Sequence, residues 1–167
     1  MVKYLSKSFI INFLLILIIF FLDRFSKIYV ISFHEKNYGS DLYNSKFLNI
    51  SLIWNEGIAF GLFSFSDKFF YHILSFLIAA VILIIMVMLT RSEGLKKYSL
   101  LMILGGALGN FYDRIIFEAV HDFIDFHVEN FHWFIFNVSD IFICLGVLFM
   151  IILEIVSNKE ESLNEKN

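Results

Sequence analysis

Two aspartates in the last third of the sequence could carry out acid–base chemistry: Asp122 in "VHDFIDF" and Asp140 in "FNVSD". Two carboxylates that lie close together do not both ionise easily, so such a pair tends to share one proton. The ionised member can take a proton from water while the protonated member polarises a carbonyl group. This combination hydrolyses a peptide bond without a metal or a covalent intermediate. The residues alone leave open whether these two aspartates form a pair.

Asp140 is a candidate because of its surroundings. It is expected about two turns, or roughly 9 Å, inside an apolar segment at 134–156, with no Lys or Arg near it in sequence. Asn137 is one turn earlier and can share its helical face. An acid at membrane depth usually faces the interior of a bundle and marks a functional site. Asp125 points away from Asp122 if "VHDFIDF" is a strand, and we expect it to be a solvated bystander.

The composition indicates that lipid surrounds these residues. Hydrophobic residues make up 59% of the 167-residue chain, which is more than a soluble domain of this size can bury. The net charge of −3 offers no basic field for nucleic acid. The single cysteine, Cys144, excludes an intramolecular disulfide, and we expect it to be a small buried hydrophobe.

Four apolar segments are expected to cross the membrane as helices within a single domain, 1–167. About 20 apolar residues in a helix span a hydrocarbon core of about 30 Å. The expected spans are about 9–33, 69–89, 98–114 and 134–156, followed by a polar cytoplasmic tail at 157–167. The predicted fold class is therefore a mainly α membrane protein of four transmembrane helices. A small extracytoplasmic β-rich segment is predicted between helices 1 and 2, from the strand-like stretch "KFLNISLIWN".

Basic residues set the expected orientation of the chain. They precede the first span and fill the short loop between the second and third, at Lys3, Lys7, Arg91, Lys96 and Lys97. The positive-inside rule then places both termini in the cytoplasm and the segments 34–68 and 115–133 outside. We therefore expect a small sheet on the outer membrane surface and an active site toward the outer face.

Further polar and small residues gather toward the outer ends of the spans. Asp23 and Lys27 are spaced i,i+4 with the acid first, which favours a helical ion pair. Asn110 and Asp113 share one helical face, and Arg114 beside them completes a predicted polar cluster. "WNEGIAFGLF" taken alone could be a turn, and "GGALGN" could be a packing surface of small residues between helices.

Taken together, these motifs resemble the lipoprotein signal peptidases of bacteria, also called signal peptidase II. The resemblance rests on an aspartate in "DRFSK", then "NEGIAFGLF", "GGALGNFYDR", "VHDFIDF" and "FNVSD", in the family's order over nearly the whole chain. It implies an aspartic protease of the bacterial inner membrane that cleaves a prolipoprotein just before its diacylglyceryl-cysteine. The implied partners are lipidated prolipoprotein and membrane lipid. We expect a monomer, with no metal, cofactor or nucleic acid.

By position, the resemblance implies that Asp122 and Asp140 are the catalytic aspartates. It implies substrate-binding or supporting roles for Asp23, Asn55, Gly57, Asn110, Asp113, Arg114 and Asn137. The chain departs from the usual family pattern at Arg24, Ser26, Ile58 and Ser139, where glutamine, threonine, a small residue and alanine are common. We expect Ile58 to narrow the substrate groove and Arg24 to add a charge near the site.

Two other functions compete with this interpretation. A metalloprotease could use a loose set of ligands, namely His121, Asp122, Asp125, His127 and His132. The chain has no HExxH-type helix, however, and the spacing of these residues specifies no geometry. A small transporter or channel subunit could use Asp23 and Asp140 as a proton relay, but the spans are too few for an inverted repeat. Zinc-restored cleavage would favour the first alternative, and proton flux without proteolysis the second.

Overall fold

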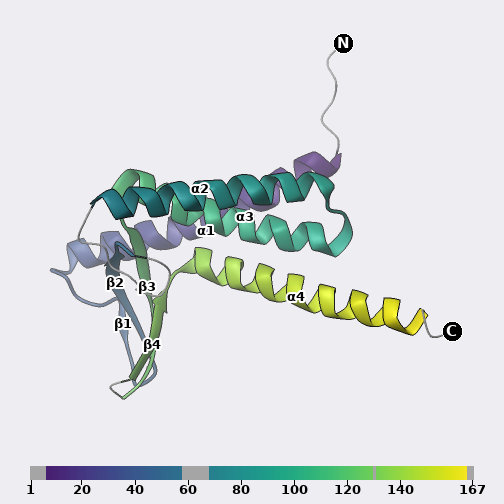
Figure 1. Ribbon diagram of the computed structural model, residues 1–167. Coiled ribbons are helices and arrows are strands. Elements are labelled where there is room, and N and C mark those ends of the chain that lie inside the picture. The colour runs from purple at the N-terminus through teal and green to yellow at the C-terminus, as the bar shows by residue number, and fades with distance from the viewer. Residues whose placement is uncertain (1–6, 58–67, 130, 165–167) are drawn as a thin grey trace, which may run out of the picture.

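The computed structural model describes residues 7–57, 68–129 and 131–164. Within these residues, four long helices form a bundle, and a small antiparallel sheet lies at one end of it (Figure 1). The elements are, in order, α1 (Lys7–Lys36), β1 (Tyr43–Asn44), β2 (Leu48–Asn55), α2 (Lys68–Arg91), α3 (Gly94–Phe117), β3 (Val120–Val128), β4 (Phe131–Phe136) and α4 (Val138–Asn164). The predicted fold class is confirmed.

All four helices are long and apolar enough to cross a membrane. Their outer surfaces carry large exposed hydrophobic side chains, such as those of Phe25, Phe76, Leu83 and Ile155. Large contiguous apolar surfaces of this kind are rare on soluble monomers, so the solvent that suits them is lipid. The interior contains a smaller packed cluster between α2 and α3, formed by Ile82, Ile85, Leu100 and Leu104.

The predicted boundaries agree with the structure to within about one helical turn for the first three spans, but the fourth begins later than predicted. Residues 134–136 belong to strand β4, and α4 begins at Val138. Asn137 caps the helix: its Oδ1 accepts a hydrogen bond from the backbone N of Asp140, and its own backbone N donates to Asp140 Oδ2, both at 3.1 Å. This is a reciprocal capping arrangement. Asp140 therefore lies in the first turn of α4, and its predicted position two turns inside the helix is wrong.

The sheet joins two segments that are far apart in the sequence. Its strand order is β1–β2–β3–β4 with antiparallel pairing throughout. β1 and β2 lie between α1 and α2, as predicted, whereas β3 and β4 add two strands from the connection between α3 and α4. One sheet lies on one side of a membrane, so both connections lie on the same side. α1 begins and α4 ends at the opposite end of the bundle (Figure 1).

Small residues of α3 allow α4 and α1 to approach it closely, as "GGALGN" predicted. A Cβ atom added to Gly106 would lie 2.5 Å from the backbone O of Ser139 in α4. At Gly109, an added Cβ would meet the Ser139 hydroxyl and would lie 2.8 Å from Oδ2 of Asp23 in α1. Only hydrogen fits at these positions, and the close approach places polar groups of the three helices within bonding distance.

Candidate active site

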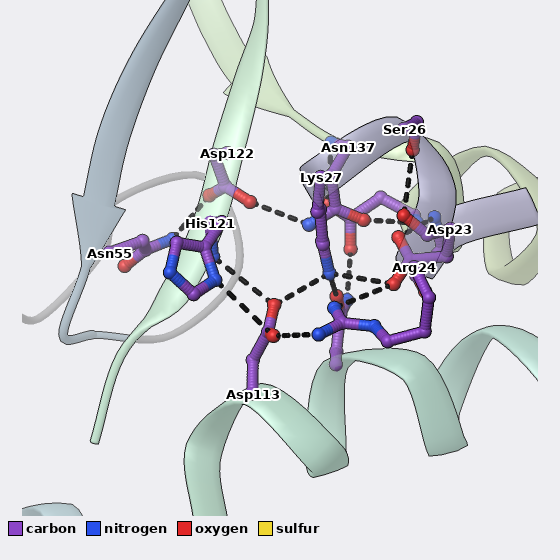
Figure 2. Close-up of polar contacts among 12 residues, drawn as sticks. Asp23, Arg24, Ser26, Lys27, Asn55, Asp113, His121, Asp122 and Asn137 are labelled. Atoms are coloured by element: carbon purple, nitrogen blue, oxygen red, sulfur yellow. Dashed lines mark hydrogen bonds and ion pairs between the residues drawn. The ribbon is translucent and has the colours of Figure 1, made fainter. Parts of the chain in front are cut away.

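Asp122 on β3 and Asp140 on α4 line one cavity of about 320 Å³. Asn137 binds both: its side-chain Nδ2 donates to Asp122 Oδ1 at 2.6 Å, and its backbone N donates to Asp140 Oδ2 at 3.1 Å. The other oxygens accept hydrogen bonds from Asn55 Nδ2, at 2.8 Å to Asp122, and from Asn110 Nδ2, at 2.7 Å to Asp140. Figure 2 shows Asp122 between the side chains of Asn55 and Asn137. The structure thus brings together the two aspartates that the sequence singled out.

Arg114 and Gly57 support the wall of the cavity beside Asp122. The Nη2 of Arg114 donates to the backbone O of Gly57 at 2.7 Å, and Gly57 N donates to Asn55 Oδ1 at 2.9 Å. With its oxygen engaged in this way, the Asn55 side chain presents its nitrogen to Asp122. Arg114 therefore bonds to the turn after β2, and in this respect it differs from the predicted cluster with Asn110 and Asp113.

The rest of the cavity wall is apolar. It is formed by residues of α2, α3, β3 and α4, namely Leu74, Ile78, Ala107, Val120, Ile143 and Cys144. Cys144 is exposed, so its predicted burial is wrong. Membrane helices turn many apolar side chains away from the bundle interior, because lipid is as apolar as a protein core. The cavity therefore combines one polar end with walls that suit an apolar ligand.

A buried network of charges lies between α1 and α3 (Figure 2). Lys27 Nζ lies 2.9 Å from Asp23 Oδ2 and 2.8 Å from Asp113 Oδ2, and donates to Asn110 Oδ1 at 2.9 Å. An ammonium group has three N–H donors, and all three are used. Arg24 lies 3.0 Å from Asp23 Oδ2 and 2.6 Å from Asp113 Oδ1. Two cations face two carboxylates, so the charge that Arg24 adds near the site is balanced.

This network also positions the pair Asp122 and Asp140, called the dyad from here on. Because Asn110 Oδ1 accepts from Lys27, its Nδ2 is left to donate to Asp140. Asp23 Oδ1 accepts a hydrogen bond from the backbone N of Ser139 at 3.0 Å, which holds the first turn of α4 against α1. The predicted Asp23–Lys27 ion pair is confirmed. Its connection to Asn110 was not predicted, because it crosses from one helix to another.

Residues near the dyad differ from the sequence-based expectations in two further respects. Asp125 is buried, at 3% exposure, so its prediction as a solvated bystander is wrong. It lies on the face of β3 that also carries buried His121 and Phe123, opposite to the face of Asp122. His121, which the sequence offers only as a candidate metal ligand, packs between the rings of Trp54 and Phe117. Its Nδ1 lies 3.2 Å from Asp113 Oδ1.

The ligand set considered for a metalloprotease is divided in the structure. Among the described residues, the group that could hold an ion comprises Asp125, His127 and His132, whereas Asp122 belongs to the dyad. The predicted effect of Ile58 on the groove lies outside the described residues.

The pH dependence of stability tests the burial of Asp122. Burial raises the pKa of this carboxyl from 3.8 to about 6, and the negative charge of Asp140 contributes as well. Between these values the folded protein holds a proton that the unfolded chain releases, so the free energy of unfolding increases as pH falls through about 6 toward 4. Asp122→Asn removes this proton. We expect the stability of the unmodified protein relative to the variant to rise by about 2 kcal/mol between about pH 7.5 and about pH 4.5.

Thermal denaturation of both proteins in detergent, from about pH 7.5 to about pH 4.5, measures this difference. Because the two proteins share all other titrating groups, the difference between the curves reports Asp122 together with its electrostatic coupling to Asp140. Parallel curves would contradict the burial of an acid with a raised pKa.

Helices that are long and apolar enough to cross a membrane, with a buried polar site where they meet the sheet, define a multi-pass membrane protein. The family model described as signal peptidase (SPase) II matches residues 15–156. The chain belongs to this family of bacterial membrane peptidases, and the resemblance noted from its motifs is confirmed.

Individual relatives support the same assignment. The chain is 45% identical to a lipoprotein signal peptidase of Pelagibacter ubique (strain HTCC1062), over 96% of each chain. It is 34% identical to a lipoprotein signal peptidase of Anaplasma marginale (strain Florida), over 90% of this chain and 87% of that protein. A solved bacterial membrane enzyme shares the fold with a TM-score of 0.69 at 23% identity, covering 95% of this chain and 93% of that one.

Proposed function

We propose that the protein is an aspartic endopeptidase that removes the signal peptide from lipid-modified prolipoproteins, cutting just before the diacylglyceryl-cysteine. The observation that carries the proposal is the pair Asp122 and Asp140, bound to one residue, Asn137, at the wall of an apolar cavity. Membership of the signal peptidase II family supplies the substrate class.

The dyad would act as a base and an acid that exchange roles. One carboxylate takes a proton from water as the water oxygen attacks the scissile carbonyl carbon, while the protonated carboxyl gives its proton to the carbonyl oxygen. The resulting tetrahedral diol then collapses. One hydroxyl returns its proton to the second carboxylate, the C–N bond breaks, and the leaving nitrogen takes the proton that came from water. The pair ends, as it began, with one proton.

The surroundings of the dyad support proton sharing. Within the part of the chain that the structure describes, the four groups that donate to its oxygens are uncharged: the side chains of Asn55, Asn110 and Asn137, and one backbone amide. A Lys or Arg bound directly to either carboxylate would favour its ionised form. Here Arg24 and Lys27 are paired with Asp23 and Asp113 instead. These two cations hold the site in place, and neither is bound directly to the dyad.

The proposal also includes the orientation of the enzyme in the membrane, its oligomeric state and its cofactor requirement. The sheet and the start of α4, which carry Asp122 and Asp140, lie at the end of the bundle away from the start of α1 (Figure 1). With both termini cytoplasmic, the active site lies toward the outer face of the inner membrane, where lipidated precursors arrive. One chain contributes both aspartates, so a monomer suffices, and the mechanism requires no metal or cofactor.

Removing the acyl chains from the precursor tests the substrate class. We expect kcat/KM to fall at least about a hundredfold, because burying even four methylenes at about 0.8 kcal/mol each contributes about 3 kcal/mol. The lipid would also hold the scissile bond next to the dyad. Purified protein in detergent is incubated with lipidated and unlipidated forms of one precursor, and the products are quantified by mass analysis. Equal cleavage of the two forms would refute the proposed specificity.

A further inference from the structure

Three side chains on the β3–β4 hairpin have the types and the placement of transition-metal ligands. They are Asp125 and His127 of β3 and His132 of β4, and one ligand atom from each lies within 4.8 Å of the others. Asp125 Oδ2 lies 2.8 Å from His132 Nδ1 and 3.7 Å from His127 Nδ1. The two imidazole rings stack with their centroids 5.1 Å apart and an interplanar angle of 24°. Three donors therefore converge on one point.

An irregularity in the strand pairing creates this convergence. Phe126 pairs with Phe134, but the next residue of β3, His127, pairs with His132, so Trp133 is an extra residue in β4. Such a bulge changes the face to which the following side chains point. Directly opposed residues of an antiparallel pair share a face, so His132 joins His127. Asp125, two residues earlier in β3, lies on that face as well.

The distances fit a tetrahedral ion. Zinc binds imidazole nitrogen and carboxylate oxygen at about 2.0–2.1 Å, and two such ligands in a tetrahedron lie about 3.3 Å apart. The distances from Asp125 Oδ2 to the two histidines, 2.8 and 3.7 Å, lie on either side of this value. Shifts of about half an ångström, which rotation of the side chains provides, would place both in coordination distance.

Both oxygens of Asp125 are hydrogen-bonded to His132 Nδ1, at 3.0 and 2.8 Å, whereas another ligand nitrogen of the cluster has no partner among the described residues. Among the described residues, the buried His127 Nδ1 has no hydrogen-bond partner. The Asp125 side chain is 5% exposed, so its negative charge lies largely out of water. Buried charges are normally paired or coordinate a metal. A divalent cation would bind this unpartnered nitrogen and balance the negative charge of the Asp125 carboxylate.

We propose that Asp125, His127 and His132 bind a divalent transition-metal ion of the zinc class, with water completing the tetrahedron. A set of two imidazoles and one carboxylate suits zinc better than magnesium or calcium, which prefer oxygen ligands. The site is separate from the dyad: Asp125 lies three residues along β3 from Asp122, about 10 Å by strand rise, and on the opposite face. The ion would join β3 to β4 and so stabilise the strand that carries Asp122.

Metal titration of the purified full-length protein tests this site. After treatment with a chelator and its removal, Zn²⁺ is titrated calorimetrically in detergent, with Mg²⁺ as a parallel titrant. We expect one Zn²⁺ per chain with a Kd below about 10 μM, no binding of Mg²⁺, and a higher melting temperature with Zn²⁺. His127→Gln and His132→Gln should each weaken Zn²⁺ binding at least about tenfold. His72→Gln, a change of an exposed histidine on α2, is the matched control and should bind as the unmodified protein does.

His132→Gln provides a variant that should fold normally and lacks one of the proposed ligands. The His132 side chain is 52% exposed, so His132→Gln should fold, and its melting temperature without metal verifies this. Failure of the unmodified protein to bind Zn²⁺, or unchanged binding by folded His132→Gln, would overturn the proposal. Neither result depends on the peptidase activity, since binding and melting are measured without substrate.

Discussion

Asp122→Asn and Asp140→Asn should each lower kcat at least about 10³-fold while leaving the affinity for a lipidated precursor nearly unchanged. An amide keeps the shape of the carboxyl group but cannot exchange the proton on which the mechanism depends. Since the two residues act as one unit, the double variant should be scarcely less active than either single variant. Gel-shift cleavage of a lipidated precursor in detergent measures turnover, and inhibition by uncleaved precursor measures affinity.

Two controls separate lost chemistry from lost structure. Asp41→Asn removes an exposed aspartate from the same side of the molecule and should keep full activity. At position 122 an amide also gives up one hydrogen bond, because Asn55 and Asn137 both present nitrogen donors to this side chain. Circular dichroism and melting curves must therefore show that the variants are folded. A folded Asp122→Asn variant that keeps more than about a tenth of the activity would exclude this residue as an acid or base.

Lys27→Met should cause the largest loss of stability, about 3–5 kcal/mol in the free energy of unfolding. Lys27 is fully buried and neutralises Asp23 and Asp113, and removing one partner of a buried pair leaves uncompensated charge. The change also frees the oxygen of Asn110, whose amide then loses its fixed orientation toward Asp140. Turnover should therefore fall even at temperatures where the variant is folded. Thermal denaturation and cleavage assays on one preparation measure both effects.

A surface lysine provides the matched control for this change. Lys96 pairs with Glu154 at 2.8 Å, but both side chains are about half exposed, so Lys96→Met should cost no more than about 1 kcal/mol. Adding Asp113→Asn to Lys27→Met removes one of the two buried negative charges and should restore part of the stability. Equal losses in the Lys27 and Lys96 variants would show that the buried network contributes little.

The helices could be predicted from the sequence because a bilayer requires long apolar segments, and α1 and α2 follow hydropathy closely. The start of α4 could not be found in this way, because strand β4 is as apolar as the helix that follows it. A local signal was present in "NVSD", where Asn137 and Asp140 have the spacing of a helix cap. Recognising it would have placed Asp140 in the first turn of the helix.

The two dyad residues could be identified from their setting and from the family motifs. The contacts that hold these two residues in place could not be predicted. The contacts of Lys27 with Asn110, and of Asp23 with Ser139, join helices that are distant in sequence. The burial of Asp125 depends on strand pairing and on the bulge at Trp133, and a bulge leaves no periodic signal in a short strand. Nonlocal pairing of this kind becomes visible only in the folded chain.

Cleavage of a lipidated precursor in H₂¹⁸O by the purified protein is the most direct test of the central claim. With the unmodified protein, mass analysis should find a single cut just before the diacylglyceryl-cysteine, with one ¹⁸O atom in the new carboxyl terminus of the released peptide. Folded Asp122→Asn and Asp140→Asn variants should release neither product. The same labelled products from either variant, at the rate of the unmodified protein, would contradict the assignment of these two carboxylates as the catalytic pair.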